Sequence, residues 1–495
     1  MNLYDALTQY SSTDAYPFHM PGHKRRAAHL CDPALIDITE IDGFDNLHHA
    51  EGILKEAQER AAALYGSSET HFLVNGSTAG ILSAIGACTR PDSCLLMARS
   101  SHRSAYNAAA LNRVRTAWLY DPVDPAQVEA ALERQADVCA LFLTSPSYDG
   151  VVCDVERIAQ IAHNRGVILI VDEAHGAHFG MHPCFPESSV KLGADLVIHS
   201  LHKTLPALTQ TALLHVNGPL ADRRRLRYLL SVYQTSSPSY VLMASMDQCI
   251  RLLSEQKDTL FAAYADRLWR FYERTKLSHY SFRRTDDPSR ILICPPAGFC
   301  SAPGEQPSAD GFCSALSDGT AAMQLYHTLR ERFHLQPEMV SPSHVLMLSS
   351  VCDDEEGFRR LSDALLTLDR EFAAGIKARH VSKSCPHAIA PEASFPPSGR
   401  QSGESPQTCC TIAAALEERT QAVPFSDSAG YVSAEFLMRY PPGVPLLVPG
   451  ERITEAIIRR TELLQKCGYS MQGMEDHSLR QIRVISDSHM KELIQ

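Results

Sequence analysis

Two side chains suited to covalent amine chemistry follow two apolar segments of the chain. Lys203 comes just after the segment Leu196–His199, and Asp172 comes directly after the segment Val167–Val171. A lysine amine can capture an aldehyde as a Schiff base, and a buried carboxylate can keep a pyridine nitrogen protonated. The pair therefore predicts a site for pyridoxal phosphate, with Lys203 as the covalent anchor and Asp172 against the ring nitrogen.

A phosphate site is predicted over residues 75–80, which read Asn-Gly-Ser-Thr-Ala-Gly. They follow the apolar segment His71–Val74 and precede the apolar stretch Ile81–Cys88, where a strand is expected to give way to a helix. Small residues at a helix start expose backbone N–H groups and hydroxyls, and the helix dipole attracts an anion there. Ser77 and Thr78 are the candidate phosphate ligands, and an ordinary helix N-cap is the alternative interpretation.

One histidine is a candidate for stacking on the cofactor ring. His102 follows the apolar segment Ser93–Met97, in the run Ser-His-Arg-Ser, where its ring could cover one face of the cofactor. A histidine at the end of a strand is equally suited to capping a helix or to contact with water. The stacking role is therefore a hypothesis that depends on the residues placed around His102.

The run Asp-Glu-Ala-His over residues 172–175 admits two other interpretations. The same letters spell a nucleotide-helicase motif, but that motif works with a Gly-Lys phosphate loop and the chain contains no Gly-Lys pair. His175, His178 and His182 could hold a metal, yet their spacing does not match the His-Glu-x-x-His pattern of a zinc helix. We therefore predict neither a nucleotide site nor a metal site.

The region 67–216 alternates short apolar segments with amphipathic stretches. Val138–Leu143 and Val167–Val171 are typical of strands, and Val155–Arg165 between them has the apolar spacing of a helix. This pattern predicts an α/β fold with a mainly parallel sheet, whose strands are apolar on both faces and covered by helices. Ligands bind at the carboxyl ends of such strands, where Asp172 is expected.

Composition excludes several classes of protein. The 495 residues are 44% hydrophobic and 21% charged, with a formal net charge of −11, so no general basic field exists for nucleic acid or an acidic membrane. The first residues lack a signal-like apolar run, and no apolar stretch has the length of a membrane span. The 15 cysteines form no Cys-x-x-Cys pattern, which argues against a disulfide framework. These features predict a cytoplasmic protein.

The length of the chain predicts several domains. We expect an N-terminal arm over 1–50, a cofactor-binding large domain over 51–280, a small α/β domain over 281–380, a flexible linker over 381–410 and a C-terminal domain over 411–495. The linker is expected because its prolines stand among Ser and Gly, a composition that buries too little apolar surface to fold. The proline-rich run 440–451 is predicted to lack regular structure.

These segments together resemble the ornithine/lysine/arginine decarboxylase family, the fold type I pyridoxal phosphate enzymes of bacterial polyamine and acid-stress metabolism. The likeness covers most of the chain, and many motifs in one order make it specific. Besides the segments above, it rests on Pro17-Phe-His-Met-Pro-Gly-His-Lys24, Asp42-Gly-Phe-Asp-Asn-Leu-His48, Thr235-Ser-Ser-Pro-Ser-Tyr240, and the run from Tyr440-Pro-Pro-Gly-Val-Pro to Pro449-Gly-Glu451. The resemblance implies a large domain like that of aspartate aminotransferase, with a smaller α/β domain and a C-terminal domain.

The resemblance also implies a role for each candidate residue at the cofactor ring. Lys203 would form the Schiff base, and Asp172 would pair with the pyridine nitrogen. His102 would stack on the ring, and His175 would flank the ring near Asp172. The residues implied around the phosphate are Ser77, Thr78, Ser200 and His202.

Family members are dimers or multiples of dimers whose active sites lie at the subunit interface. By resemblance, Thr235 and Ser236 would reach the phosphate held by the neighbouring subunit, and Glu451 would face the distal cation of the substrate. This chain begins close to its Pro-Gly-His-Lys motif, which leaves no room for the N-terminal wing domain of the larger bacterial members. We therefore expect a homodimer or a tetramer.

The reaction implied is decarboxylation of a basic L-amino acid, namely arginine, lysine or ornithine, to the amine and carbon dioxide. An aminotransferase or an amino-acid lyase on the same fold is the alternative, because Lys203 and Asp172 serve those reactions equally well. A non-catalytic cofactor-binding regulator is the alternative from another class. The three amino acids differ in the distance from Cα to the distal cation, which the sequence does not measure.

Overall fold

The computed structural model describes residues 2–26, 32–296, 314–375, 406–440, 443–466 and 468–486, with only the backbone over 314–320. The chain divides into two compact units. The larger unit comprises Ala28–Lys203, Ala207–Lys257 and Pro396–Gln495, and the smaller unit comprises Met1–Ala27, Thr204–Pro206 and Asp258–Phe395. Residues 376–405 lie outside the described residues, and with them lies most of the predicted linker 381–410.

The larger unit is built on a sheet in the order β2-β8-β7-β6-β5-β3-β4. Its strands are β2 (Glu69–Leu73), β3 (Cys94–Ala98), β4 (Arg115–Leu119), β5 (Val138–Thr144), β6 (Ile168–Asp172), β7 (Leu196–His199) and β8 (Ala212–Val216). The five strands from β4 through β3, β5 and β6 to β7 run parallel to one another. Strand β8 is antiparallel to both of its neighbours, β7 and β2. The predicted mainly parallel sheet is confirmed.

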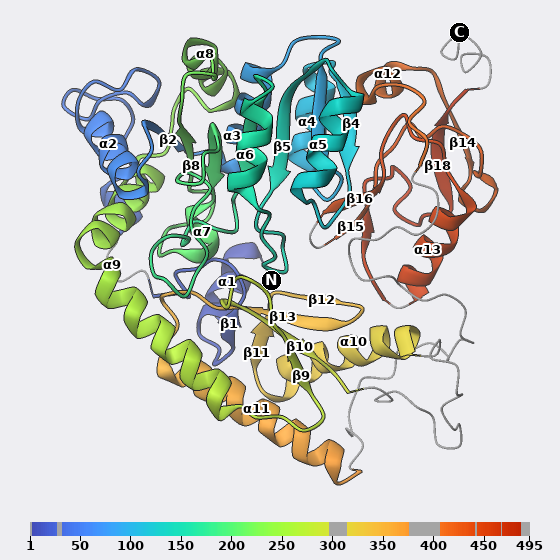
Figure 1. Ribbon diagram of the computed structural model, residues 1–495. Helices are drawn as coiled ribbons and strands as arrows, with labels where there is room; N and C mark the ends of the chain where they lie inside the picture. The colour runs from blue at the N-terminus through green and yellow to red at the C-terminus, as the bar shows by residue number, and fades with distance from the viewer. Residues whose placement is uncertain are drawn as a thin grey trace. The chain divides into compact units, whose positions relative to one another are not determined.

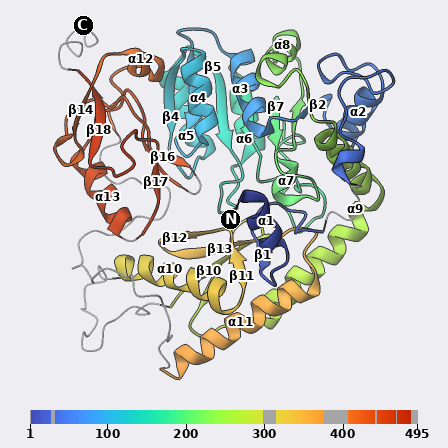
Figure 2. The ribbon, with the colours of Figure 1, turned by 180° about the vertical axis from the view of Figure 1, so that it is seen from behind.

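Helices cover both faces of this sheet (Figures 1 and 2). The helices between residues 53 and 274 are α2 (Ile53–Tyr65), α3 (Gly76–Cys88), α4 (Arg103–Leu111), α5 (Pro125–Arg134), α6 (Val155–His163), α7 (Leu201–Thr204), α8 (Arg223–Tyr233) and α9 (Tyr240–Arg274). The long helix α9 contains the boundary with the smaller unit. Short 3-10 helices are η1 (Pro33–Leu35), η2 (Leu47–His49) and η3 (Phe425–Asp427). Apolar side chains of α3 and α4 pack with those of the central strands into one core, which excludes water from this side of the sheet.

The C-terminal segment packs with the sheet-bearing part of the chain within the larger unit. Its elements are α12 (Ile412–Glu417), β14 (Thr420–Pro424), β15 (Leu437–Arg439), β16 (Val444–Leu447), α13 (Glu455–Lys466), β17 (Met471–Gln472) and β18 (Gln481–Ile485). Ile412, Phe436, Met438 and Val448 join the core cluster of α3 and α4, which ties this segment to the sheet-bearing part of the chain.

The smaller unit contains a four-stranded antiparallel sheet in the order β12-β13-β10-β9. Its elements are α1 (Leu3–Ser11), β1 (Tyr16–Phe18), β9 (Ser281–Arg283), β10 (Arg290–Cys294), α10 (Ser314–Arg332), β11 (Leu335–Pro337), β12 (Met339–Ser341), β13 (His344–Leu348) and α11 (Glu355–Ala373). The residues predicted as an N-terminal arm are divided, because β1 pairs in parallel with β11 and brings Met1–Ala27 into this unit.

The Pro-Gly-His-Lys motif has a structural role in the smaller unit. Lys24 is 4% exposed, and its Nζ donates to the carbonyl oxygens of Pro17 at 3.0 Å, His19 at 3.0 Å and Leu348 at 2.8 Å. Burial lowers the pKa of Lys24, and Asp353 opposes that shift. A Cβ at Gly22 would lie 2.8 Å from the backbone N of Leu205, so only glycine fits there without movement of the backbone.

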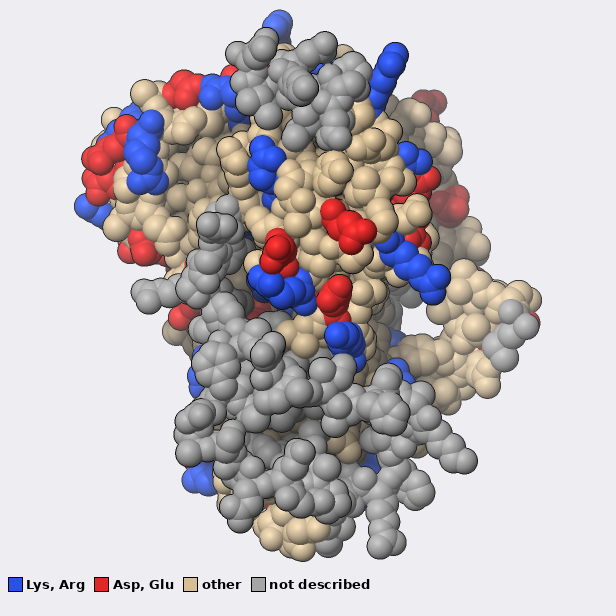
Figure 3. Space-filling view, turned by 90° about the vertical axis from the view of Figure 1, so that its right-hand side faces the viewer, with Lys and Arg blue, Asp and Glu red and all other residues tan. Residues whose placement is uncertain are grey.

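Charged side chains of both signs lie among one another on the face shown in Figure 3. No patch of a single sign gathers among the residues coloured there. Among the described residues, no helix combines the length and the apolar character needed to cross a lipid bilayer.

Candidate active site

The ends of two neighbouring strands bring the two predicted key residues to one edge of the sheet. Asp172 is the last residue of β6, and β7 leads through His199 and Ser200 into the short helix α7, which carries Lys203. Strands β6 and β7 are parallel and hydrogen-bonded, with Asp172 opposite Ile198. The structure therefore places both residues at the carboxyl ends of parallel strands, where ligands bind in such sheets.

The amine of Lys203 is paired with an imidazole. Nζ of Lys203 lies 3.0 Å from Nε2 of His175, within hydrogen-bond distance. The ring of His175 in turn contacts the ring of Tyr148, with centroids 4.6 Å apart. Tyr148 was not predicted from the sequence, although it follows the end of β5 as Lys203 follows the end of β7.

Asp172 is buried, with 4% of its surface exposed. Burial raises the pKa of Asp172, and the positive charge of Lys203, the backbone N–H of Ala174 and His199 oppose the rise. The N–H of Ala174 donates to Oδ1 at 3.1 Å and holds the carboxylate in place. A buried acid beside a lysine is suited to stabilising a second cation, as a protonated pyridine nitrogen requires.

His102 caps a helix and also lines a cavity. It is the N-cap of α4, and its Nδ1 accepts from the backbone N–H of Ser104 at 3.3 Å and lies 2.8 Å from Oγ of Ser104. Burial, the charge of Lys203 and the charge of Arg103 lower the pKa of His102 to about 4, so the ring is neutral at pH 7. A neutral ring held by its cap suits stacking on an aromatic cofactor.

The start of α3 has the features predicted for a phosphate site. Gly76 opens the helix at φ 71°, and the N-cap Asn75 makes no side-chain capping bond. Ser77 and Thr78 occupy the first turn, where backbone N–H groups have no intrahelical partner. This geometry leaves donors available to an anion.

Two further residues predicted around the phosphate lie at the exit of β7. Ser200 is completely buried, and its Oγ has no hydrogen-bond partner among the described residues. Nδ1 of His202 lies 2.9 Å from the carbonyl oxygen of Thr211, to which it donates, and burial lowers the pKa of His202 to about 4. A buried hydroxyl without a partner is costly unless a ligand binds it, so Ser200 fits a phosphate oxygen.

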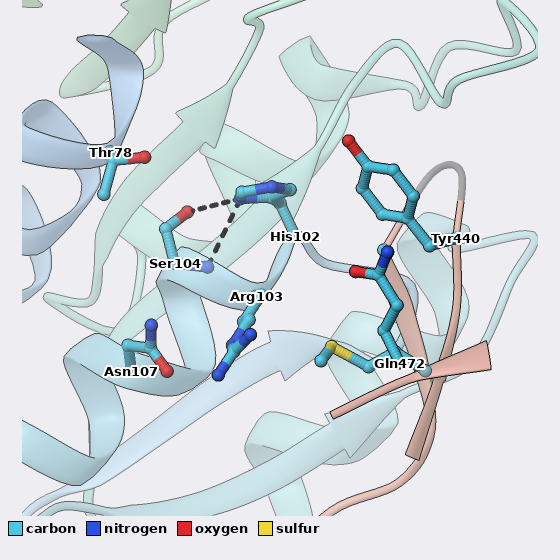
Figure 4. A pocket seen from close by; sticks show the side chains of 9 residues that line it. Thr78, His102, Arg103, Ser104, Asn107, Tyr440 and Gln472 are labelled. Carbon is cyan, nitrogen blue, oxygen red and sulfur yellow. Dashed lines mark hydrogen bonds between the residues drawn. The ribbon is translucent and has the colours of Figure 1, made fainter. Parts of the chain in front are cut away.

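A cavity of about 170 Å³ is lined by two of the predicted site residues, Thr78 and His102 (Figure 4). One side comes from the sheet-bearing part of the chain and carries Thr78 and His102, and the other side comes from the C-terminal segment and carries Tyr440 and Gln472. Its full lining is Thr78, His102, Arg103, Ser104, Asn107, Met438, Tyr440, Gly443 and Gln472. Gln472 could not be predicted from the sequence, because only the folded C-terminal segment brings it to this cavity.

Thr235 and Ser236 are exposed and lie near the start of α3. The backbone N–H of Thr235 donates to Oδ1 of Asn75 at 3.2 Å, and its carbonyl oxygen lies 2.9 Å from Nε2 of His48. The structure therefore fixes the backbone of this loop and leaves both hydroxyl side chains on the surface of a single chain.

The expectation that Glu451 faces the substrate is corrected by its position. Glu451 is 1% exposed, and its Oε2 accepts from Arg99 at 2.9 Å and from the backbone N–H of Val448 at 2.8 Å. Burial raises the pKa of Glu451, which Arg99 opposes. The carboxylate is thus already paired with a cation, and it serves to hold the C-terminal segment against the end of β3.

The histidines considered above as metal ligands do not form a metal-binding cluster among the described residues. No group of three or more His, Cys, Asp or Glu side chains within the described ranges could hold a metal ion. His178 instead packs its ring against Phe179 and Phe185, with centroids 4.9 Å apart in each case.

Comparisons with known proteins identify the family of this chain. The family described as Orn/Lys/Arg decarboxylase, major domain, matches residues 1–291, and its C-terminal domain matches residues 404–478. A Bacillus subtilis protein, YaaO, is 32% identical and covers 95% of each chain. An arginine decarboxylase of Halalkalibacterium halodurans is 29% identical and covers 98% of this chain and 97% of its own.

Solved structures show the same fold. The constitutive lysine decarboxylase of Escherichia coli aligns with a TM-score of 0.72 at 18% identity, over 98% of this chain and 81% of its own. The alanine–glyoxylate aminotransferase of Nostoc aligns with a TM-score of 0.51 at 15% identity, over 74% of this chain and 99% of its own. At such identities the likeness concerns the fold alone, and the predicted fold type I architecture is confirmed.

Proposed function

Because the chain belongs to the Orn/Lys/Arg decarboxylase family, we propose that it uses pyridoxal phosphate to decarboxylate a basic L-amino acid. The products would be carbon dioxide and the corresponding amine. The observation that carries this proposal is the convergence of Lys203, paired with His175, and buried Asp172 at one edge of the sheet.

The residues present fit the cofactor. The partnerless Oγ of Ser200 and the uncapped first turn of α3 suit its phosphate, together with Ser77, Thr78 and His202. When bound, pyridoxal phosphate supplies an electron-poor ring that accepts the electron pair left by departing carbon dioxide. Asp172 supports that role by favouring a protonated ring nitrogen.

The chain's own side chains account for the other requirements of the reaction. Lys203 is the amine that attaches the cofactor covalently, and His175 holds its Nζ in a fixed direction. His102, neutral because its pKa is about 4, offers an uncharged face for stacking. Lys203 and His175 are also the groups placed to return a proton to Cα, since both reach the same point of the site.

Arginine is our preferred substrate. Relatives named arginine decarboxylase are 28% to 29% identical to this chain, whereas the constitutive lysine and ornithine decarboxylases of Escherichia coli are 23% and 21% identical. Glu451 provides no support for any of the three, because its charge is paired with Arg99. We also propose a cytoplasmic homodimer, or a tetramer built from two such dimers, with Thr235 and Ser236 completing the neighbouring site.

The proposal is tested by incubating the purified protein and pyridoxal phosphate with arginine, lysine or ornithine separately. We expect carbon dioxide and one amine, agmatine in the case of arginine, without any keto-acid acceptor. Product that forms only when a keto acid is added would instead establish the aminotransferase alternative. Cofactor binding without turnover of any amino acid would support the non-catalytic regulator.

A further inference from the structure

A line of buried polar side chains crosses the sheet beside the candidate site. Glu173, His199, His215 and Thr70 are 1%, 0%, 0% and 4% exposed, and the proposed reaction uses none of them. Glu173 Oε1 lies 2.7 Å from His199 Nε2, His199 Nδ1 lies 3.1 Å from His215 Nε2, and His215 Nδ1 lies 2.8 Å from Thr70 Oγ1. We call these four residues the polar chain.

The partners of Glu173 determine where a positive charge lies in the polar chain. Its carboxylate accepts from Ser188 Oγ at 2.7 Å, from the N–H of Ser189 at 2.8 Å and from Oγ of Ser189. Of its hydrogen-bond partners within the described part of the chain, only His199 can carry a positive charge. A buried carboxylate is costly unless a cation neutralises it, so we assign the imidazolium form to His199.

The protons along the rest of the polar chain follow from this assignment. An imidazolium donates from both nitrogens, so His199 donates to Glu173 and to Nε2 of His215. Burial and the charge of His199 lower the pKa of His215 well below its usual value, so its ring is neutral. His215 then carries its proton on Nδ1 and donates it to Thr70, and every member of the polar chain is satisfied.

The charged end of the polar chain lies at the two strand ends that form the candidate site. Glu173 directly follows Asp172 at the end of β6, and His199 is the last residue of β7 before Ser200 and α7. The other group packed on His199 is the ring of Tyr65 from α2, with centroids 4.8 Å apart. Among the groups around Asp172, Lys203 and His199 both oppose the effect of burial on its pKa.

We propose that His199 is a positioning residue with a permanent positive charge, which keeps Asp172 ionised when the charge of Lys203 changes. The lysine amine must be uncharged to react with an aldehyde, so its charge cannot support Asp172 throughout a reaction cycle. The buried Glu173–His199 pair takes no part in that chemistry and keeps its charge. This inference rests on the proposed function, in which Asp172 serves the cofactor ring.

The test measures the dissociation constant of pyridoxal phosphate against pH for the wild type and three variants. His199→Gln keeps a donor near Glu173 and removes the charge, so we expect the pH below which affinity is lost to rise by about one unit. Thr70→Val removes the nearer of two acceptors for Nδ1 of His215 and leaves only Oγ of Ser67, at 3.3 Å. His215 then favours its other tautomer more than in the wild type, and that tautomer favours an uncharged His199. We expect a smaller upward shift for Thr70→Val, which changes little volume at a site remote from Asp172.

His163→Gln is the matched control. His163 Nε2 lies 2.9 Å from Oδ2 of Asp195, and that pair links the end of α6 to the residue before β7. The Glu173–His199 pair instead links the ends of β6 and β7. We expect this variant to lose thermal stability without any shift in the pH dependence of cofactor affinity.

The outcomes separate the inference from the proposed function. Suppose that the wild type binds the cofactor and that His199→Gln and Thr70→Val show the same pH dependence of affinity. That result would overturn the permanent charge on His199. An equal shift in His163→Gln would also overturn it, because the effect would then follow from lost stability. If His199→Gln does not fold, Thr70→Val alone decides. A wild type that binds no pyridoxal phosphate at any pH would instead refute the proposed function.

Discussion

Nζ of Lys203 and Nε2 of His175 are hydrogen-bonded at 3.0 Å. An ammonium group only donates, so His175 must offer a lone pair on Nε2 while Lys203 is charged. The imidazole can therefore take the proton that the amine has to lose before it reacts with an aldehyde. Two residues predicted separately from the sequence thus act as one unit in the structure.

Replacing Lys203 with alanine should remove covalent attachment of the cofactor. We expect turnover to fall by a factor on the order of 10³ or more, because the amine nucleophile is lost. Borohydride reduction followed by mass spectrometry should find the phosphopyridoxyl group on the wild type and not on the variant. Lys191→Ala is the control, since Lys191 is exposed and pairs with Glu187 at 3.3 Å. Retained labelling of the Lys203 variant would contradict the assignment.

Asp172→Asn tests the carboxylate at the ring nitrogen. An uncharged amide stabilises a protonated nitrogen less, and a loss of ~3 kcal/mol in the transition state corresponds to roughly a hundredfold slower turnover. The rate constant under saturating cofactor and substrate is the measurement. Asp154→Asn, which alters only the N-cap of α6, should keep most of the activity. If the rate constant of Asp172→Asn were comparable to that of the wild type, the ring nitrogen would need no anion beside it.

Mixed dimers test whether Thr235 and Ser236 serve the neighbouring subunit. Chains carrying Lys203→Ala and chains carrying Thr235→Arg should each be inactive alone. A heterodimer would contain one site with an intact Lys203 and an intact Thr235 from the other chain, so random mixing should restore about one quarter of wild-type activity. If Thr235 instead served its own chain, the mixture would stay inactive.

The pair Arg99–Glu451 should matter for stability and not for substrate recognition. Arg99→Met leaves a buried carboxylate without its cation, which costs about 3–5 kcal/mol of unfolding free energy. Combining it with Glu451→Gln should recover part of that loss, because no uncompensated charge remains. Denaturant unfolding of the two single variants and the double variant measures this. A Glu451→Gln protein with normal stability and a strongly raised KM would restore the original expectation that Glu451 binds substrate.

His202 should make the cofactor-free protein sensitive to acid. Its pKa is about 4 in the folded chain and about 6.5 when unfolded, so the unfolded state takes up a proton at higher pH. The stabilising contribution is complete above pH ~6.5 and is lost as the pH falls towards ~4. Unfolding free energies measured across this range should fall less steeply in His202→Gln. His49→Gln, at an exposed histidine, should follow the wild type.

The sequence was a good guide where a residue's role depends on its position along a strand. Asp172 and Lys203 follow apolar segments directly, so a parallel sheet alone brings them together. It was a poor guide where distant segments meet, as when β1 pairs with β11 or Gln472 reaches the cavity. Nothing in the local composition around Tyr16–Phe18 specifies a partner more than 300 residues away.

Two errors have specific physical causes. Glu451 was expected at the substrate because it is charged and follows a family motif, but the buried Arg99 determines its partner. The run 440–451 was predicted to be irregular, yet Val444–Leu447 forms β16. That strand lies at the edge of the order β16-β15-β17, where a proline such as Pro445 can be accommodated without breaking a central ladder.

The shared core of α3, α4 and the C-terminal segment limits how this chain can be shortened. Ile412, Phe436, Met438 and Val448 are between 1% and 6% exposed and pack in that core. A chain that ended at residue 405 would lack these four side chains, so the apolar side chains of α3 and α4 that they cover would be exposed to water. Exposed apolar patches of this kind promote aggregation. Interrupted synthesis of this protein should therefore yield insoluble material instead of a smaller enzyme.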